Sequence, residues 1–173
     1  MEEVSEAAPV LWLIAGPNGV GKTTYAFRNI RQVSGSIHFV NLDEIARGLS
    51  PLDPQAATLR ASRVALEMIA DRIGERVSFS LETTLAGRTH LRMLAGAKSK
   101  GFRIHLLYFA VLSVDICLAR IARRVAEGGH DVAGDEVRRR FVRSLEQFPL
   151  YARRSDLWRV FDNNNGRPLV AAE

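Results

Sequence analysis

A phosphate-binding loop is indicated near the beginning of the chain, where residues 16–23 read GPNGVGKT and satisfy the pattern G-x-x-x-x-G-K-[ST]. Its glycines allow backbone N–H groups to turn toward a phosphate, and a helix starting near Lys22 adds its positive end. We expect Lys22 to reach the β- and γ-phosphates and the Thr23 hydroxyl to ligate Mg²⁺. The residues predicted to bind the nucleotide are Gly16, Pro17, Asn18, Gly19, Val20, Gly21, Lys22, Thr23 and Thr24.

The nucleotide is predicted to be ATP rather than GTP. A GTPase needs a guanine-reading Asn-Lys-x-Asp segment, which the sequence lacks, and no lysine lies between Lys22 and Lys98. The segment 162–166 (DNNNG) follows the last apolar run, and its amides, Asn163 in particular, either hydrogen-bond an adenine edge or form a turn.

Two carboxylates lie where apolar runs end, and in a parallel sheet that edge faces the ligand. We assign Asp43 to the attacking hydroxyl of an acceptor molecule, since a carboxylate beside the γ-phosphate can orient it and accept its proton. Glu82, with Thr83 and Thr84 after it, is assigned to the substrate or to Mg²⁺-bound water. The alternative is that each acid only caps a helix.

The basic residues are mostly arginines: 24 Lys+Arg minus the lysines at 22, 98 and 100 leaves 21. At 100° per residue, Arg120 and Arg124 share a flank of one predicted helix, and Arg138 and Arg140 flank the apolar stripe of the next. We expect Arg120, Arg124 and Arg140 to stabilise charge on a transferring phosphoryl group from a lid at about residues 120–143. The alternatives are a solvated basic surface and, for His130, simple exposure in a loop.

The elements that position these residues predict a three-layer α/β fold with a mostly parallel sheet, in one domain over residues 1–173. Short apolar runs alternate with helical patterns, as in phosphate-loop NTPases. One helix is expected after the N-cap Ser113, ending at Gly128-Gly129, and another from near Asp135 until Pro149 stops it. The expected strands are 10–15, 37–42, 77–81, 104–112 and 157–161, and the clearest helix is 56–73.

Composition is that of a folded soluble protein, with 47% hydrophobic and 25% charged residues. The first six residues are too acidic for a secretory signal, and the longest apolar run is far below the roughly 20 residues that span a bilayer. We therefore expect a cytoplasmic protein without a membrane partner. The one cysteine, Cys117, is expected to be buried and inert.

The ordered set of these motifs resembles the zeta-toxin family of phosphate-loop kinases, in its short single-domain branch. The segments that carry the resemblance, over nearly the whole chain, are 16–24, Asn41-Leu42-Asp43-Glu44, Glu82-Thr83-Thr84, Arg123-Arg124-Val125, Gly128-Gly129-His130, Arg139-Arg140-Phe141 and Asp162-Asn163.

This resemblance implies an ATP- and Mg²⁺-dependent kinase of a sugar-nucleotide hydroxyl, such as that of UDP-N-acetylglucosamine. It places the catalytic aspartate at Asp43, an acidic substrate-site residue at Glu82, and lid arginines at Arg124 and at Arg139 or Arg140. It also implies a toxin setting with a small helical antitoxin as partner.

Two other functions stay open at this point. One is a kinase of a different acceptor, such as a nucleoside, a nucleotide or an antibiotic. The other is a nucleic-acid-binding ATPase, motivated by the pI of 10.0 and the Arg138-Arg139-Arg140 run. Against nucleic acid, no aromatic residues alternate with these arginines to stack on bases.

Overall fold

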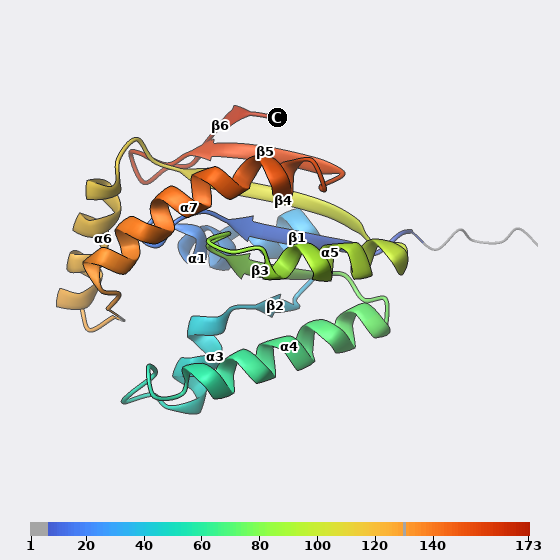
Figure 1. Cartoon of the computed structure of the whole chain (residues 1–173), viewed down its shortest axis with the longest axis horizontal. Helices are drawn as coiled ribbons and strands as arrows, with labels where there is room; N and C mark the ends of the chain where they lie inside the picture. Colours follow the sequence, from blue (N-terminus) through green and yellow to red (C-terminus); the bar gives the residue numbers. More distant parts are fainter. Residues whose placement is uncertain (1–6, 130) are drawn as a thin grey trace, which may run out of the picture.

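The computed structural model describes residues 7–129 and 131–173, and over these it forms a six-stranded sheet in the order β2-β3-β1-β4-β5-β6 (Figure 1). The first five strands in this order are mutually parallel, and β6 pairs antiparallel with β5. The strands are β1 (Val10–Ala15), β2 (Phe39–Val40), β3 (Phe79–Thr83), β4 (Arg103–Ala110), β5 (Leu157–Asp162) and β6 (Leu169–Ala172).

Helices cover both faces of the sheet, which confirms the predicted three-layer α/β fold. Residues alternate along β1, so that Leu11 and Leu13 pack on one face and Ile14 on the other, all fully buried. Burying each of these side chains contributes about 1.5–3 kcal/mol. The helical segments are α1 (Lys22–Tyr25), the π-helical η1 (Ala26–Ile30), α2 (Arg31–Ser34), α3 (Leu42–Leu49), α4 (Thr58–Gly74), α5 (Thr89–Ser99), α6 (Val114–Ala126) and α7 (Gly134–Ala152).

One face is covered by α4, α5 and the end of α7, and the other by α1, η1 and α6. The first half of α7 packs with α6 through Val137, so this helix runs from one layer into the other. In Figure 1, α3 and α4 lie beside β2 at one edge of the sheet. The functional side chains are therefore held by elements of both layers.

The predicted strand at 37–42 is wrong at both ends, because β2 covers only Phe39–Val40. Strand β2 ends at Val40 because the Asn41 side chain accepts hydrogen bonds from the backbone N–H groups of Asp43 and Glu44 at 2.9 and 3.2 Å, and so starts α3. Strand β4 likewise ends at Ala110 rather than Leu112, which is exposed. Strand β3 runs from 79 to 83 instead of 77 to 81, so Glu82 lies inside the strand rather than after it.

The prediction that Pro149 stops the last helix is also wrong, since α7 continues to Ala152. Proline removes one backbone hydrogen bond, but the following turn buries Tyr151 completely and lets its hydroxyl donate to the Gly87 carbonyl at 2.8 Å. The start of α6 is as predicted, with the Ser113 side chain accepting from the Asp115 N–H. Helix α5 and strand β6 were not predicted.

Cys117 is buried, as expected, and burial raises the pKa of its thiol. Across the described ranges, no helix has the length and apolar character needed to span a membrane.

Candidate functional site

The phosphate loop joins β1 to α1 as the sequence predicts, and its glycines have backbone angles that few other residues adopt. Gly16 has φ +137° and Gly21 has φ +101°. A Cβ atom on Gly16 would lie 2.3 Å from the Phe109 carbonyl oxygen, and one on Gly21 would lie 2.5 Å from the Asn163 side-chain nitrogen. The loop is thus packed against β4 and the segment after β5, which fixes its shape.

Lys22 lies at the first position of α1 and is 6% exposed. Its ammonium donates to the Pro17 carbonyl oxygen at 2.8 Å. Burial lowers the pKa of this ammonium, whereas the neighbouring carboxylates of Glu82 and Asp43 oppose that shift. A buried cation with two acids beside it is suited to bind a polyphosphate.

Glu82 is brought to the phosphate loop by the register of β3, which places it opposite Ile14 of β1. One carboxylate oxygen accepts from the Thr23 hydroxyl at 2.9 Å and the other from the Asn41 side-chain amide at 2.8 Å. Burial raises the pKa of this carboxyl, against the opposing effect of Lys22. The alternative role of a helix cap does not apply to Glu82, because it lies within a strand.

The Thr23 hydroxyl and the Glu82 carboxylate are oxygen donors of the kind that Mg²⁺ prefers. No group of three or more His, Cys, Asp and Glu side chains suited to a metal occurs in the described part of the chain. Mg²⁺ usually keeps several waters and binds substrate phosphates beside one or two protein ligands, so this sparse donor set fits it.

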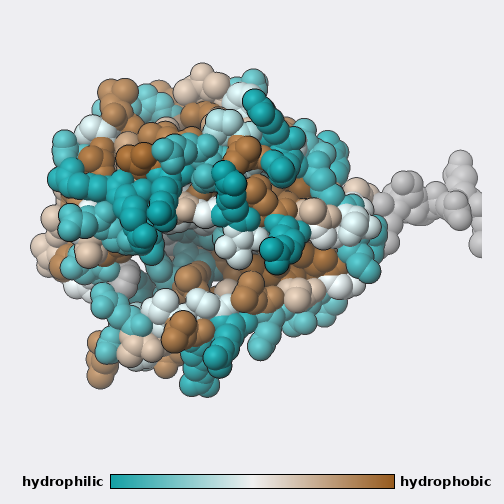
Figure 2. Space-filling model, viewed as in Figure 1, coloured by the Kyte–Doolittle hydropathy of each residue, from teal (hydrophilic) through white to brown (hydrophobic). Residues whose placement is uncertain are grey.

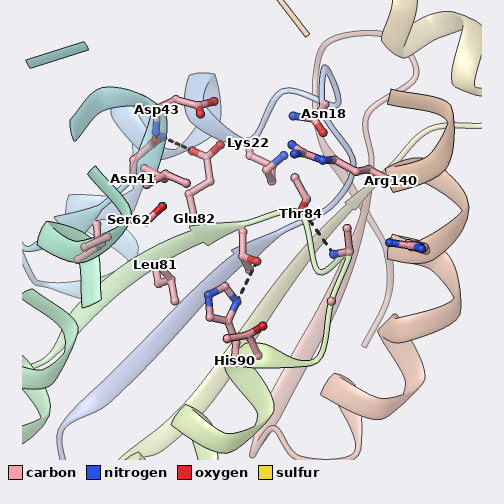
Figure 3. Close-up of a pocket in the computed structure, with 18 of the residues that line it drawn as sticks. Asn18, Lys22, Asn41, Asp43, Ser62, Leu81, Glu82, Thr84, His90 and Arg140 are labelled. Atoms are coloured by element: carbon pink, nitrogen blue, oxygen red, sulfur yellow. Dashed lines mark hydrogen bonds between the residues drawn. The ribbon is translucent and has the colours of Figure 1, made fainter. Parts of the chain in front are cut away.

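Asp43 lies in the first turn of α3, one residue beyond the first helical position, and Asn41 rather than Asp43 caps that helix. Figure 3 shows Asp43, Glu82 and Lys22 around one end of a pocket. The alternative role proposed for Asp43, that of a helix cap, is therefore filled by Asn41. The Asp43 side chain lies beside the phosphate-loop lysine.

Two large cavities meet around these residues, a smaller one adjoins the phosphate loop, and Figure 2 shows the molecule hollowed on this face. The phosphate-loop cavity, of about 560 Å³, lies between residues 18–24 and the α6 arginines. The α4–α7 cavity, of about 520 Å³, lies between those two helices over the end of β3. A smaller β5-side cavity, of about 200 Å³, is lined by Gly21, Thr24, Tyr25, Arg28, Asn29, Arg120, Asn163, Gly166 and Pro168.

The two large cavities share four residues. These are Asn18, Lys22, Asp43 and Glu82. The β5-side cavity in turn shares Gly21, Thr24 and Arg120 with the phosphate-loop cavity. A molecule bound along the phosphate loop would thus meet a second molecule at Lys22 and Asp43.

Arg120 and Arg124, two of the three arginines of α6, have different surroundings. Arg120 donates to the backbone carbonyls of Asn163 and Asn164 at 2.7 and 3.0 Å, so it ties α6 to the segment after β5. Arg124 lines the phosphate-loop cavity, and its buried Nε and Nη2 have no hydrogen-bond partner among the described residues. Unpartnered buried guanidinium donors are costly, which points to an anion as the missing partner.

Arg139, Arg140 and Arg143 of α7 line the α4–α7 cavity instead, whereas Arg138 is exposed and pairs with Asp115. Both Arg139 and Arg140 donate to Glu136, with Arg140 Nε at 2.5 Å from one carboxylate oxygen. The hydrogen bond from Arg139 is the largest cause, with that from Arg140, of a lowered pKa at Glu136. The Glu136 carboxylate is therefore ionised at neutral pH. Figure 3 shows Arg140 reaching from α7 toward Asn18 and Lys22.

Asn163 is buried, and its side-chain amide donates to the Val20 carbonyl of the phosphate loop at 2.7 Å. The amide thus supports the loop, and Asn163 lines the β5-side cavity. Its Oδ1 is buried and has no hydrogen-bond partner among the described residues. Thr83 and Thr84 both line the α4–α7 cavity. His130, which the sequence left as an exposed loop residue, is outside the described residues.

Sequence reasoning gave no site role to Asn41, Ser62 or His90. Asn41 could have been found from its spacing, because Asn followed three residues later by Glu44 is a helix-start pattern. Ser62 and His90 line the α4–α7 cavity from α4 and α5. Neither carries a signal in the sequence, since only the packing of these helices brings them to the site.

The sheet order and the phosphate loop between β1 and α1 define a protein with a phosphate-loop kinase-like fold. The chain belongs to the family described as AAA domain (AAA_33), whose model matches residues 11–148. A protein of Haemophilus influenzae, described as uncharacterized, is 36% identical over 126 residues, which are 73% of this chain and 88% of that protein.

Solved structures share the fold. The AvrRxo1-ORF1:-ORF2 complex with ATP contains a chain with a TM-score of 0.73 and 17% identity, covering 94% of this chain and 57% of that one. The PezAT chromosomal toxin-antitoxin system of Streptococcus pneumoniae contains one with a TM-score of 0.67 and 15% identity, covering 95% and 71%. The protein thus spans little more than half the length of the AvrRxo1 chain that it matches.

Proposed function

We propose that this protein is a kinase that transfers the γ-phosphate of ATP to a hydroxyl of a small molecule, specifically a sugar nucleotide such as UDP-N-acetylglucosamine. The observation that carries the proposal is that the phosphate-loop and α4–α7 cavities meet at Lys22, Asp43 and Glu82. An ATPase needs room only for water beside the γ-phosphate. A second cavity of about 520 Å³ at that point is suited to an acceptor molecule.

On the donor side, the triphosphate lies along residues 16–24 and the adenine occupies the β5-side cavity beside Asn163. Lys22 and Arg124 bind the phosphate oxygens with donors that are already buried, so little solvent reorganisation is needed during transfer. Thr23 and Glu82 would hold Mg²⁺, which supplies positive charge beside the transferring phosphoryl group when it is bound.

On the acceptor side, Asp43 orients the incoming hydroxyl and accepts its proton as oxygen attacks the γ-phosphorus and ADP leaves. Arg140 reaches the same point from α7 and stabilises charge on the transferring group. Arg139 and Arg143, on the same wall, are suited to the phosphates of a sugar nucleotide, and Thr84 supplies a hydroxyl at the end of β3. The Thr83 hydroxyl, which contacts the Leu85 N–H and His90 Nδ1, supports the acceptor cavity rather than the acceptor itself.

We further propose that the chain works as one catalytic domain and that residues 120–143 form its lid. Arg120 then acts through the carbonyls of Asn163 and Asn164, positioning the lid relative to the nucleotide. The similarity in fold to a chain of the PezAT toxin-antitoxin system, together with the zeta-toxin motifs, supports an antitoxin protein as a partner.

The experiment is to incubate the protein with ATP, Mg²⁺ and UDP-N-acetylglucosamine, and to search by mass for the addition of one phosphate. A metabolite extract replaces the sugar nucleotide if that compound gains none. We expect Lys22→Ala and Asp43→Ala each to abolish transfer, because one loses the phosphate-binding cation and the other the base.

Phosphoproduct formation that persists in Asp43→Ala would remove Asp43 from this role. The pI of 10.0 favours binding to nucleic acid, so the same experiment should include RNA. If RNA strongly stimulated ATP hydrolysis and no metabolite gained phosphate, the protein would be a nucleic-acid-dependent ATPase instead.

A further inference from the structure

His90 lies in the first turn of α5 and lines the α4–α7 cavity. Figure 3 shows it at the end of the pocket away from Lys22 and Asp43, where the reaction is proposed to occur. The chemistry described above gives this histidine no part. The contacts around His90, however, fix its position and indicate which ring nitrogen carries hydrogen.

The turn that leads to His90 is held by specific contacts. Leu85 has a left-handed backbone (φ 53°) although it is not glycine, and its side chain is almost completely buried. Its N–H donates to the Thr83 hydroxyl oxygen at 3.2 Å, and the Tyr151 hydroxyl donates to the Gly87 carbonyl. A non-glycine residue keeps such a conformation only where the surrounding structure imposes it.

The Thr83 hydroxyl also indicates which nitrogen of His90 carries hydrogen. Its oxygen lies 3.2 Å from His90 Nδ1 and already accepts the Leu85 N–H. Among the described residues the hydroxyl proton has no other acceptor, and we therefore assign it as donated to Nδ1. Burial lowers the pKa of His90, which favours the neutral ring, and a neutral ring that accepts at Nδ1 carries its hydrogen on Nε2.

That Nε2–H donor faces a mainly apolar part of the cavity. Figure 3 shows the second ring nitrogen turned toward the side of Leu81 and Ser62. The Ser62 hydroxyl donates a hydrogen bond to the Thr58 carbonyl oxygen at 2.8 Å, so its proton already has an acceptor within α4. The apolar residues that line the cavity as a whole are Val40, Leu42, Ala65, Leu66, Ile69, Leu81 and Ala86.

We propose that His90 is a specificity-determining residue for the acceptor molecule, donating its Nε2–H to a carbonyl, ether or hydroxyl oxygen remote from the hydroxyl that is phosphorylated. This inference rests on the proposed kinase function and adds a recognition contact to it. A few placed polar groups in an otherwise apolar cavity fix the orientation of a ligand. An acceptor without an oxygen at this point leaves the donor buried and unpaired, and is bound less well.

The test measures phosphoproduct formation from a serially diluted, deproteinised bacterial metabolite extract with saturating ATP. The variants are His90→Leu, which removes the donor, and His90→Gln, whose side-chain N–H lies near the position of Nε2. His105→Gln is the matched control, because His105 lies in β4 and outside the cavity. The concentration of ATP at half-maximal rate is measured for each variant.

We expect His90→Leu to need about threefold to tenfold more extract for half-maximal rate, the loss expected for one hydrogen bond. The maximal rate and the ATP dependence should stay within twofold of the wild type. His90→Gln should recover most of the extract dependence, and His105→Gln should match the wild type. An unchanged extract dependence in His90→Leu would overturn the inference, as would a change in maximal rate alone, which a merely structural residue produces.

A second measurement separates this inference from the proposed function. The ¹⁵N shifts of the His90 ring, measured by NMR on the wild-type protein, should show the neutral tautomer with hydrogen on Nε2. Hydrogen on Nδ1 overturns the inference even if the protein is a kinase. Absence of any phosphoproduct with the wild-type protein instead overturns the kinase function, and the recognition role of His90 with it, whatever the tautomer.

Discussion

The two cavities that meet at Lys22 are built in different ways. The phosphate-loop cavity takes much of its lining from residues 18–24, a continuous stretch whose glycines present the backbone. The α4–α7 cavity is lined by side chains of β3, α4, α5 and α7, which are distant in sequence. A polyphosphate can be held by backbone N–H groups and cations, whereas recognition of a particular acceptor needs side chains from several elements.

The largest effect should come from Arg124 on the donor side of this comparison. Arg124→Ala removes buried donors that have no partner among the described residues, and should lower the rate of phosphoryl transfer by on the order of 10³-fold. Arg123→Ala is the matched control, because its side chain is 81% exposed and pairs with Glu127. The measurement is the steady-state rate of phosphoryl transfer at saturating ATP. Similar losses of rate in both variants would show that Arg124 does not stabilise the transferring phosphoryl group.

The second prediction concerns the backbone of the phosphate loop. Gly16→Ala combines φ +137° with a clash against the Phe109 carbonyl, and should cost about 3 kcal/mol or more of unfolding free energy and most of the ATP affinity. Gly96→Ala in α5 meets nothing within 4 Å and should instead stabilise the protein by about 0.5–1 kcal/mol. Urea unfolding and ATP titration measure both. Normal ATP affinity in Gly16→Ala would argue against a backbone-built site.

A pH titration tests the place where the cavities meet. Because burial raises the pKa of Glu82, this carboxyl takes up a proton at a higher pH than an exposed glutamate does. The Mg²⁺-dependent part of the ATP affinity should therefore be present above that pKa and lost as the pH falls through it. Glu82→Gln should show the low-affinity behaviour at every pH, and a wild-type affinity independent of both pH and Mg²⁺ would exclude Glu82 as a metal-site residue.

The raised pKa also has a consequence for folding. The folded protein binds the Glu82 proton more tightly than the unfolded chain does, so this group's contribution to stability is present below the unfolded pKa and lost as the pH rises through the folded one.

The smallest effect should come from Glu136 on the acceptor side. Glu136→Gln weakens the hold on Arg139 and Arg140 and frees them for an anionic acceptor, so the acceptor KM should fall several-fold, as expected for about 0.2–1 kcal/mol. Glu127→Gln, which breaks the exposed pair with Arg123, should leave it unchanged. A rise in KM would mean that Glu136 itself contacts the acceptor or holds the arginines in their binding geometry.

The same contrast explains what the sequence could predict. The residues at 16–23 are adjacent, so their spacing alone identifies the loop, and the alternation of apolar runs with helical patterns gives the α/β fold. Asp43 and Glu82 were found because strand ends share one edge of a parallel sheet. His90 was not, since no local pattern shows that α5 faces α4 across a cavity.

The errors at element ends have similar causes. Pro149 reads as a stop signal, but the burial of Tyr151 in the folded protein outweighs one lost backbone hydrogen bond. The end of β2 depended on a single side chain, Asn41, which both caps α3 and binds Glu82. The functions proposed for Arg120 and Asn163 remain predictions, although each proves to hold a structural contact beside the nucleotide cavities.

The most direct measurement of the central claim is a ³¹P NMR time course of ATP and Mg²⁺ with a metabolite extract and the wild-type protein. The account predicts a new phosphate-ester resonance that grows in step with ADP and is absent with Asp43→Ala. Growth of ADP together with inorganic phosphate alone would contradict it, because the γ-phosphate would then be passing to water rather than to a molecule in the α4–α7 cavity.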